Sequence, residues 1–482
     1  MDKRTTLKKT LKPHWVWAIA LGSAIGWGAF VQPINWMKTA GPLGVIIGMC
    51  IGAGLMMLIA VSYGLLIKEF PVSGGEFAYA YISLGRTHAF ICGWFLTLGY
   101  ISIVALNASA LSLMIKYIFP SIVENVHLYT VAGWDVYLVE ILIATASLII
   151  FGYLNIKGTG FSGRVQFFMA LFILLSVAVL AVLVGIGPET SLSNAQPYFP
   201  KQTTTFAAIV SIVAIAPWAY VGFDTIPQAA EEFDFPAKKA FNLIIFALIF
   251  SAIIYSVMVF VTAIVSPWEA VADKGYLWGT GTIIQEKIGT VGLVLLVLAL
   301  TMGVFTGLNG FIMGGSRVLF AMARAKILPG VLERVHGEQK TPHIAIIFTI
   351  IISAIAPWFG RETLEWVVDM SSIGVSIAYF YTCLTAFQFF VWSEKGAPSD
   401  RKYAVSPVKK TISLIGVISS ITFVCLLLVP GSPAFLGPES RIALLIWVAL
   451  GLIFYFFKRK EYQKIPKKEL DYLILGDKRK KI

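Results

Sequence analysis

The sequence predicts an all-α integral membrane protein with twelve transmembrane helices, and its composition is the first observation that does so. Of the 482 residues, 57% are hydrophobic and 13% are charged, whereas soluble domains are about 45–50% apolar and about a quarter charged. The apolar residues are spread over almost the whole length of the chain. The composition therefore excludes a disordered chain, a disulfide scaffold and a soluble enzyme with a single anchor.

The spacing of the apolar runs is the second observation. A helix needs about 20 apolar residues to cross the hydrocarbon core, and the chain contains twelve suitable runs. They cover residues 15–37, 42–67, 89–119, 136–156, 165–186, 206–230, 241–265, 291–320, 344–358, 366–392, 412–429 and 442–457. The first run is too long for a signal peptide and has no small-residue cleavage pattern near its start, so we expect it to be retained.

The distribution of basic residues is the third observation, and it predicts the orientation. With the N-terminus inside, 31 of the 38 Lys and Arg residues fall in the N-terminal arm, the cytoplasmic loops and the C-terminal tail. This asymmetry follows the positive-inside rule. It predicts a multi-pass protein of the plasma membrane, in a bacterium the inner membrane, with both termini cytoplasmic. Topology thus accounts for the net charge of +12 without a nucleic-acid partner, and the basic tail could also lie on membrane lipid.

Two of the twelve runs contain residues that interrupt a helix. The first has three glycines between Gly22 and Gly28, and each glycine weakens the helix. The sixth has Pro217 and Pro227, and proline removes a backbone donor and clashes with the preceding turn. Gly22 and Pro217 are 195 residues apart and begin successive sets of five spans. This pattern indicates an inverted repeat with its ligand site at the broken helices, although glycine and proline also act as packing and kink residues.

Three stretches carry a resemblance to a known family. They are Gly22-Ser23-Ala24-Ile25-Gly26-Trp27-Gly28, FPVSGGEFAY at 70–79 and SRVLFAMAR at 316–324. In this order and spacing they resemble the amino acid–polyamine–organocation (APC) transporter superfamily over the first ten spans, and the last two spans match only in number. The sixth span, with YVGFD at 220–224 followed by Glu231 and Glu232, is most similar to the branch of cationic amino acid transporters and their bacterial relatives.

The resemblance implies a LeuT-like fold, a five-plus-five inverted repeat with discontinuous first and sixth helices and two added C-terminal helices. The expected organisation is a cytoplasmic arm (1–14), a first repeat (15–186), an extracellular loop (187–205), a second repeat (206–392), a cytoplasmic loop (393–411), two added helices (412–457) and a basic cytoplasmic tail (458–482).

The broken helices have the chemistry to bind a zwitterion. Unpaired charges in a low-dielectric site are costly, and backbone N–H groups of residues 23–27 at a helix N-terminus would satisfy a carboxylate. Free carbonyls near residues 214–218 would accept from the ammonium group. The predicted binding residues are Gly22, Ser23, Ala24, Ile25, Gly26, Trp27, Ala214, Ala216, Trp218 and Tyr220.

Trp218 and Asp224 are the candidate gating or coupling residues. The resemblance implies that an aromatic residue at position 218 closes over the substrate as a lid, and its ring could attract an amine. Helix packing is the alternative for Trp218 and Tyr220. Asp224 is an ionisable residue deep in a span, and such residues are functional by default. It could couple protons, form a gate or pair with a cationic substrate, and a structural hydrogen bond is the alternative.

Other polar residues support weaker hypotheses. Inward-side ion pairs that break as a gate opens could involve Glu76, Arg86, Glu231, Glu232 and Arg317. The fifth span has no lysine, unlike family members that use one for proton coupling, and Thr306 is a candidate hydroxyl for a sodium site. Proton co-transport, sodium co-transport and ion-free exchange all stay open.

The signals of other functional classes are missing. The five histidines never stand at i, i+4 and the four cysteines lie in apolar runs, so we expect no metal site, disulfide or cofactor. No phosphate-binding glycine loop points to an ATP-driven pump. The predicted function is a secondary active transporter, not an enzyme, that moves an amino acid by alternating access. A transporter of polyamines or other organic amines and an amino-acid sensor are the alternatives, and the oligomeric state is not predicted.

Overall fold

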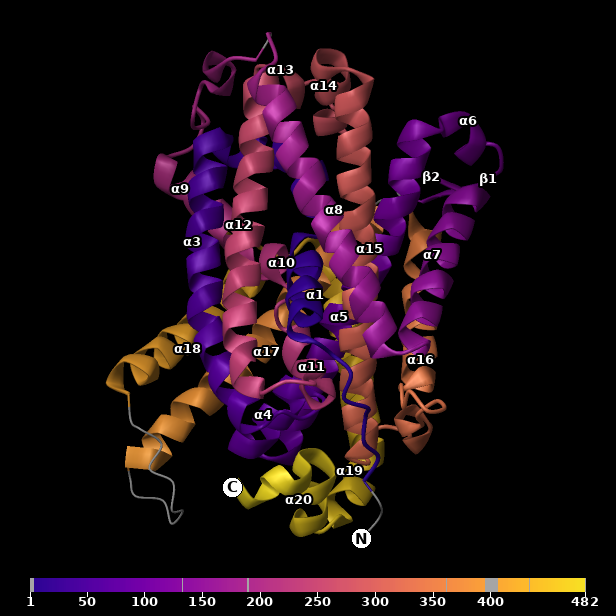
Figure 1. Cartoon of the computed structure of the whole chain (residues 1–482), viewed down its shortest axis with the longest axis vertical. Coiled ribbons are helices and arrows are strands. Elements are labelled where there is room, and N and C mark those ends of the chain that lie inside the picture. Colours follow the sequence, from indigo (N-terminus) through magenta and orange to yellow (C-terminus); the bar gives the residue numbers. More distant parts are fainter. Residues whose placement is uncertain are drawn as a thin grey trace.

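The chain folds into a bundle of long helices that run between two faces (Figure 1). Both termini lie on one face, which we call the termini face, and we call the other the opposite face. The computed structural model describes residues 4–131, 133–188, 190–360, 362–394, 406–432 and 434–481. Within these residues, nine helices are long and apolar enough to cross a membrane, and Thr205–Ala214 and His343–Phe359 are shorter apolar helices.

The helices follow the predicted apolar runs. In the first half they are α1 (Pro13–Ile25), α2 (Gly28–Val31), α3 (Pro33–Glu69), α4 (Gly75–Leu84), α5 (Arg86–Ile118), α6 (Pro120–Val123), α7 (Leu138–Ile156) and α8 (Thr159–Gly185). The sixth run forms α9 (Thr205–Ala214), α10 (Ala216–Tyr220) and α11 (Thr225–Gln228). The remainder are α12 (Ala240–Val265), α13 (Trp268–Ala272), α14 (Gly279–Ile288), α15 (Thr290–Arg324), α16 (His343–Ser353), α17 (Glu362–Glu394), α18 (Pro407–Leu428), α19 (Pro438–Lys464) and α20 (Lys467–Leu475).

Short 3₁₀ helices and one hairpin complete the described elements. The 3₁₀ helices are η1 (Leu192–Ala195), η2 (Ala230–Glu232), η3 (Ala237–Lys239), η4 (Gly330–Glu333), η5 (Ala356–Phe359) and η6 (Gly476–Lys481). The hairpin pairs β1 (His127–Val131) with β2 (Trp134–Tyr137) in antiparallel register. The all-helical prediction missed this hairpin, whose strands are rich in the β-branched and aromatic residues that favour strands.

The first two predicted spans are joined through a sharp bend. Helix α3 begins in the first predicted run and continues through the second, with a kink at Gly41 where φ is +69°. A Cβ atom at this position would lie 2.4 Å from the carbonyl oxygen of Tyr198. Glycine is therefore required at position 41 by both its backbone conformation and its close approach to another segment. Of the predicted loop 393–411, residues 395–405 lie outside the described part of the chain.

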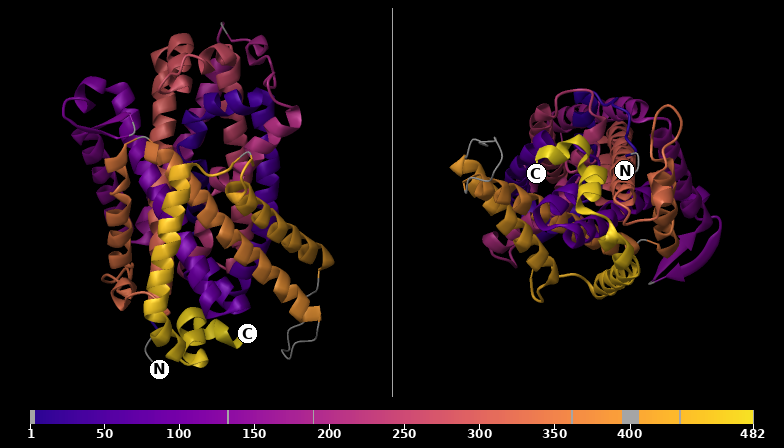
Figure 2. Two further views of the ribbon diagram at one scale, coloured as in Figure 1. Left: turned by 180° about the vertical axis from the view of Figure 1, so that it is seen from behind. Right: turned by 90° about the horizontal axis from the view of Figure 1, so that it is seen from below.

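Helix α5 lies at the centre of the bundle and packs closely against both α15 and α17. Arg317 and Arg324 near the end of α15 are almost fully buried. Helices α18 and α19 are peripheral and expose apolar side chains such as Phe457, as expected for helices that face lipid. Helix α20 lies across the termini face (Figure 2), where Leu470 and Leu473 are buried.

The contact between α5 and α17 requires glycine at position 374. A Cβ atom there would lie 2.5 Å from the carbonyl oxygen of Phe95 and 2.8 Å from the amide nitrogen of Gly99. Because both are backbone atoms, Gly374→Ala should lower the free energy of unfolding by about 1–3 kcal/mol. The matched control is Gly54→Ala on α3, where a Cβ meets nothing within 4 Å, and thermal unfolding of the purified proteins compares them. Equal apparent Tm values would contradict this packing.

Candidate functional site

The first interruption of the membrane helices lies between α1 and α2. Helix α1 ends at Ile25, and Gly26 has φ +54° and ψ −151°, a combination that is essentially restricted to glycine. Helix α2 then begins at Gly28. The N–H groups of its first turn have no intrahelical carbonyl partner. An open helix N-terminus therefore lies at the predicted glycine cluster.

The predicted amide donors of the first interruption need correction. Ser23, Ala24 and Ile25 lie in the last turn of α1, where their amides belong to the helix, and the amide of Gly26 donates to Gly22 O at 3.2 Å. The open donors are therefore at the start of α2, from Trp27 to Ala29. The physical reason is that a helix ends where φ becomes positive, and only Gly26 of the three glycines has a positive φ.

The sixth run is interrupted at Ile215, between α9 and α10, and again at residues 221–224, which we call the second interruption. Ala214 and Ala216 are within helical segments, and Pro217 occupies the first turn of α10, where a missing N–H costs little. Helix α10 ends at Tyr220, and Gly222 has φ +131°. The carbonyls without i+4 helical partners are therefore those of residues 217–220.

The two interruptions touch each other. A Cβ atom on Gly222 would lie 2.5 Å from the amide nitrogen of Ala24. The hydroxyl of Tyr255, on α12, lies 3.0 Å from Ile25 O and 2.8 Å from Ala219 O. Tyr255 thus joins the broken ends of both helices. Sequence reasoning missed it, because a tyrosine within an apolar run gives no signal that separates it from the other tyrosines.

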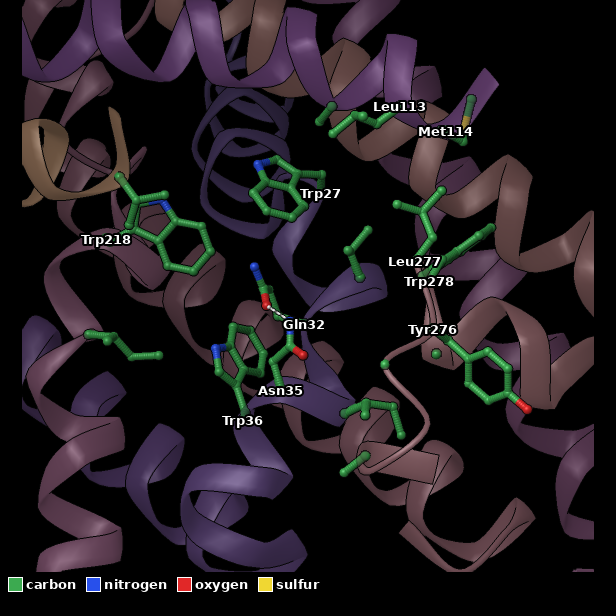
Figure 3. Close-up of a pocket in the computed structure, with 18 of the residues that line it drawn as sticks. Trp27, Gln32, Asn35, Trp36, Leu113, Met114, Trp218, Tyr276, Leu277 and Trp278 are labelled. Carbon is green, nitrogen blue, oxygen red and sulfur yellow. Dashed lines mark hydrogen bonds between the residues drawn. The ribbon is translucent and has the colours of Figure 1, made fainter. Parts of the chain in front are cut away.

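A cavity of about 850 Å³ extends from α13 and α14 to Trp27 at the first interruption and to Trp218 on α10, and its lining includes none of residues 219–224. Trp27, Trp36 and Trp218 surround its inner end (Figure 3). The ring centroids of Trp27 and Trp218 are 6.0 Å apart in an edge-to-face arrangement. A Cβ atom on Gly28 would lie 2.9 Å from Trp218, so the indole ring lies across the first turn of α2.

Of the ten predicted binding residues, Trp27 and Trp218 line this cavity. Tyr220 instead donates a hydrogen bond to Met49 O on α3 at 2.8 Å. Ala216 faces α3 as well, since a Cβ on Gly52 would lie 2.8 Å from its Cβ. The structure therefore places Trp218 at the cavity and Tyr220 in a helix contact.

Asp224 is fully buried on the other side of the second interruption. Its carboxylate accepts hydrogen bonds from Gly222 N at 2.7 Å and from the Tyr100 hydroxyl at 3.0 Å. Thr225 adds support through a hydrogen bond from its hydroxyl to Gly222 O at 2.6 Å. The carboxylate thus stabilises the unwound segment directly, and it does not line the cavity.

Buried ion pairs close the termini face. Arg317 Nε lies 2.9 Å from Glu232, and Glu231 pairs at 3.0 Å with both Arg324 and Arg4. Burial alone would raise the pKa of Glu231, but the guanidinium groups of Arg324 and Arg4 hold this pKa at about 2. Glu231, Glu232 and Arg317 therefore form ion pairs on the termini face, and the assignment of this face to the inside of the membrane stays a prediction.

The same prediction is wrong for Glu76 and Arg86. Arg86 donates to backbone carbonyls at the end of α19, including Tyr462 O at 2.7 Å. Glu76 is fully buried and accepts a hydrogen bond from the Tyr63 hydroxyl at 2.9 Å. The orientation of α4 and the start of α5 directs these two side chains to other partners.

Between α1 and α15, side chains donate hydrogen bonds to backbone carbonyl groups. Thr306 donates to Gly22 O at 3.0 Å, and the amide of Gln166 on α8 donates to Thr306 O at 3.2 Å. Asn309 donates to Gln166 Oε1 at 2.7 Å. Within the described residues, no group of three or more His, Cys, Asp or Glu could hold a metal ion.

A membrane-spanning bundle with a cavity ending at two broken helices defines a solute permease, and comparisons with known proteins agree. The family model described as amino acid permease matches residues 15–454. The chain belongs to this amino acid permease family, within the APC superfamily, and its relatives are transporters rather than enzymes.

The relatives cover nearly the whole chain. The branched-chain amino acid permease BcaP of Bacillus subtilis is 27% identical over 95% of this chain and 95% of its own length. The methylthioribose transporter of the same organism is 24% identical, covering 97% of this chain and 96% of its own. The aromatic amino acid transport protein AroP of Escherichia coli O157:H7 is 23% identical, covering 94% and 96%. These identities support amino acid transport at the level of the family.

The backbone at Gly26 provides the first test of the site. We expect Gly26→Val to abolish uptake while the protein still reaches the membrane, because a β-branched residue cannot adopt this conformation and keep the first turn of α2 open. Gly85→Val is the matched control, since Gly85 has φ +82° and ψ −163° with nothing within 4 Å of a Cβ. Full transport by Gly26→Val would contradict the site.

The ion pairs of Glu231 predict a dependence of stability on pH. The pKa of Glu231 is lowered from 4.5 to about 2, so its contribution is complete above about pH 5 and is lost as the pH falls through the folded value. At neutral pH, Glu231→Gln should have a lower apparent Tm than wild type. Its apparent Tm should then fall less than that of wild type as the pH is lowered. Glu338→Gln, at an exposed position, should keep the wild-type profile. Parallel profiles for wild type and Glu231→Gln would contradict this account.

Proposed function

We propose that the protein is a secondary active transporter that moves an amino acid across the plasma membrane by alternating access. The observation that carries this proposal is the meeting of the two interrupted helices at the inner end of the cavity. There the open N-terminus of α2 and the open C-terminus of α10 offer opposite dipole ends to one small solute. This arrangement suits a zwitterion better than a solute with a single charge.

In the proposed complex, the substrate carboxylate binds the backbone N–H groups from Trp27 to Ala29. The ammonium group binds the open carbonyls at the end of α10, where Ala219 O already accepts from Tyr255. Trp218 forms the lid, because its ring lies between the cavity and the first turn of α2. Asp224 keeps the second interruption in its unwound form and acts in gating.

The proposed architecture is twelve transmembrane helices in a five-plus-five inverted repeat with two added helices. Repeats at 15–186 and 206–392 would place α1 with α2, and α9 with α10 and α11, at corresponding positions. The basic residues favour cytoplasmic termini. With that orientation the cavity opens to the outside and the ion pairs close the inside, so the structure corresponds to an outward-open state.

The cavity walls favour an amino acid with an apolar or aromatic side chain. The lining includes Trp27, Trp36, Tyr117, Trp218, Tyr276 and Trp278. The names of two relatives, a branched-chain amino acid permease and an aromatic amino acid transport protein, agree with such walls. An organic amine is the second candidate, because Asp369 and Glu439 also line the cavity and aromatic faces attract cations.

Counterflow from proteoliposomes tests the proposal. Vesicles preloaded with unlabelled leucine, phenylalanine, arginine or putrescine receive the same labelled compound outside. A transporter gives saturable uptake that preloading accelerates, and the accelerated compound identifies the substrate class. Stabilisation by a compound in thermal unfolding without any counterflow would indicate the sensor alternative, and non-saturating flux would indicate a channel.

The lid hypothesis for Trp218 predicts a change in affinity. Trp218→Leu removes the ring over α2 and should weaken substrate binding about tenfold, which corresponds to about 1.4 kcal/mol. The measurement is the half-saturating concentration in the counterflow assay. Trp392→Leu is the control, because Trp392 is exposed near the end of α17. Equal affinities in Trp218→Leu and wild type would leave Trp218 with a packing role only.

A further inference from the structure

Two carboxyl groups are buried together beneath the second interruption. Glu76, in the first turn of α4, and Asp224, which precedes α11, both have 0% relative exposure. Helix α11 connects them, because Asp224 caps its start and Gln228 at its end donates a hydrogen bond to Glu76, while Phe223 packs on Tyr63, the other partner of Glu76. Within the described residues, neither forms an ion pair with Lys, Arg or His. Among the described residues, the two carboxyl groups therefore have no ion-pair partner that would compensate their charge.

The other titratable groups around Glu76 are neutral when protonated. They are Tyr63 on α3, Tyr79 on α4, Cys92 and Tyr100 on α5, and Tyr379 on α17. Helix α15 also packs against α4, and its charged groups Arg317 and Arg324 are held in ion pairs with Glu232 and Glu231. We call these five residues, with Glu76, Asp224 and Gln228, the carboxyl chamber. Transferring two uncompensated carboxylates into such surroundings is very costly, and sharing one proton removes one of the charges.

Several polar atoms of the carboxyl chamber have no hydrogen-bond partner. The hydroxyl oxygens of Tyr79 and Tyr379 and Oε1 of Gln228 are buried and unpartnered. An unsatisfied buried polar atom costs about 1–3 kcal/mol. Such atoms are expected where a group changes its hydrogen bonding during function. Their clustering around Glu76 indicates that the chamber accommodates more than one protonation state.

The partners of Glu76 can reverse their roles. Gln228 Nε2 donates to Glu76 Oε2, and the Tyr63 hydroxyl donates to Oε1. Rotation of the amide would bring the unpartnered Gln228 Oε1 to the carboxyl group, where it could accept from a protonated Glu76. A backbone N–H that can only donate lies at both carboxyl groups, Gly222 N–H at Asp224 and Glu76 N–H at its own side chain, so Gln228 is the partner that distinguishes the two sites. The chamber therefore accepts a proton more easily on Glu76 than on Asp224.

We propose that Glu76 takes up and releases the proton that drives transport. Asp224 keeps its negative charge, and this charge increases the affinity of Glu76 for the proton. This inference rests on the transport function proposed above and assigns its coupling residue. The proton adds to a carboxylate oxygen of Glu76 from water on one side of the membrane and returns to water on the other side. No other bond forms or breaks.

The link to gating is the short helix α11. A Cβ atom on Gly75 would lie 2.8 Å from Pro227 Cβ, so α4 and α11 are in direct contact. Glu231 and Glu232 follow α11 by three and four residues. Opening of their ion pairs displaces α11, withdraws Gln228 from Glu76 and admits water to the carboxyl group. A proton held in the closed state is then released on the termini side.

The experiment compares two fluxes in the same proteoliposomes. Wild type is expected to accumulate its amino acid when the interior is made alkaline, and to acidify the interior as substrate enters, which trapped pyranine reports. Glu76→Gln should reduce both signals at least about tenfold, while counterflow of labelled substrate persists. Glu338→Gln, an exposed carboxylate, should behave as wild type in all three measurements.

Asp224→Asn separates the two carboxyl groups. Removing the charge of Asp224 lowers the affinity of Glu76 for a proton. The pH dependence of uptake should therefore shift toward lower pH instead of disappearing. If Glu76→Gln does not fold, Glu76→Asp and Gln228→Met keep a carboxyl group in the chamber and should each shift the pH profile. Unchanged profiles in both variants would overturn the proposal.

The outcomes distinguish this inference from the proposed function. If wild type shows no counterflow with any tested compound, the transport proposal fails. If wild type shows counterflow but no coupled proton movement, or if uptake depends on sodium instead, only the role of Glu76 is overturned. Loss of counterflow together with proton movement in a folded Glu76→Gln protein would also overturn it, because the residue would then serve binding or structure.

Discussion

The structure depends on how backbone groups are satisfied where two membrane helices are interrupted. An unpaired amide or carbonyl at membrane depth is costly, yet the chain opens both helices at the same place. Side chains satisfy several of the released groups: Tyr255 donates to carbonyls at both interruptions, and Asp224 accepts from Gly222 N. Trp27 and Trp218, which carry two of the remaining open groups, line the cavity, and in the proposed complex a zwitterionic solute completes their hydrogen bonding.

The two sides of the interrupted region are closed by different kinds of interaction. Toward the cavity, the barrier consists of tryptophan rings in edge-to-face contact, and such contacts are worth only about 0.5–1.5 kcal/mol beyond their buried area. On the termini face, the barrier consists of buried ion pairs that must regain water as they separate. Because removing a partner from a buried pair is strongly unfavourable, opening this side requires concerted movement of the segment that carries both glutamates.

The sequence predicts the existence of the interruptions better than their chemistry. The positions of glycine and proline predicted the place of both interruptions to within one helical turn, because helix propensity is a local property. Which amides and carbonyls are open could not be predicted, because that depends on the single residue where φ becomes positive and on partners such as Tyr255 from another helix. The spans, the broken sixth helix and the Arg317–Glu232 pair were predictable from local pattern and charge, whereas the burial of Glu76 depends on how α4 rotates against α5 and α17.

In the proposed transport cycle, one short segment connects the helix interruption with the ion pairs of the termini face. Between Gly222 and Glu232 the chain contains an interruption, a carboxylate, the four-residue helix α11 and two paired glutamates. A helix this short has little stability of its own, so its position is set by its contacts with α4 and with the arginines of α15. In the proposed transport cycle, substrate binding would change the contacts at one end, and protonation of Glu76 or opening of the ion pairs would change them at the other. Both changes act on the position of the same few residues. Coupling between substrate binding and ion-pair opening therefore does not require a long pathway through the bundle.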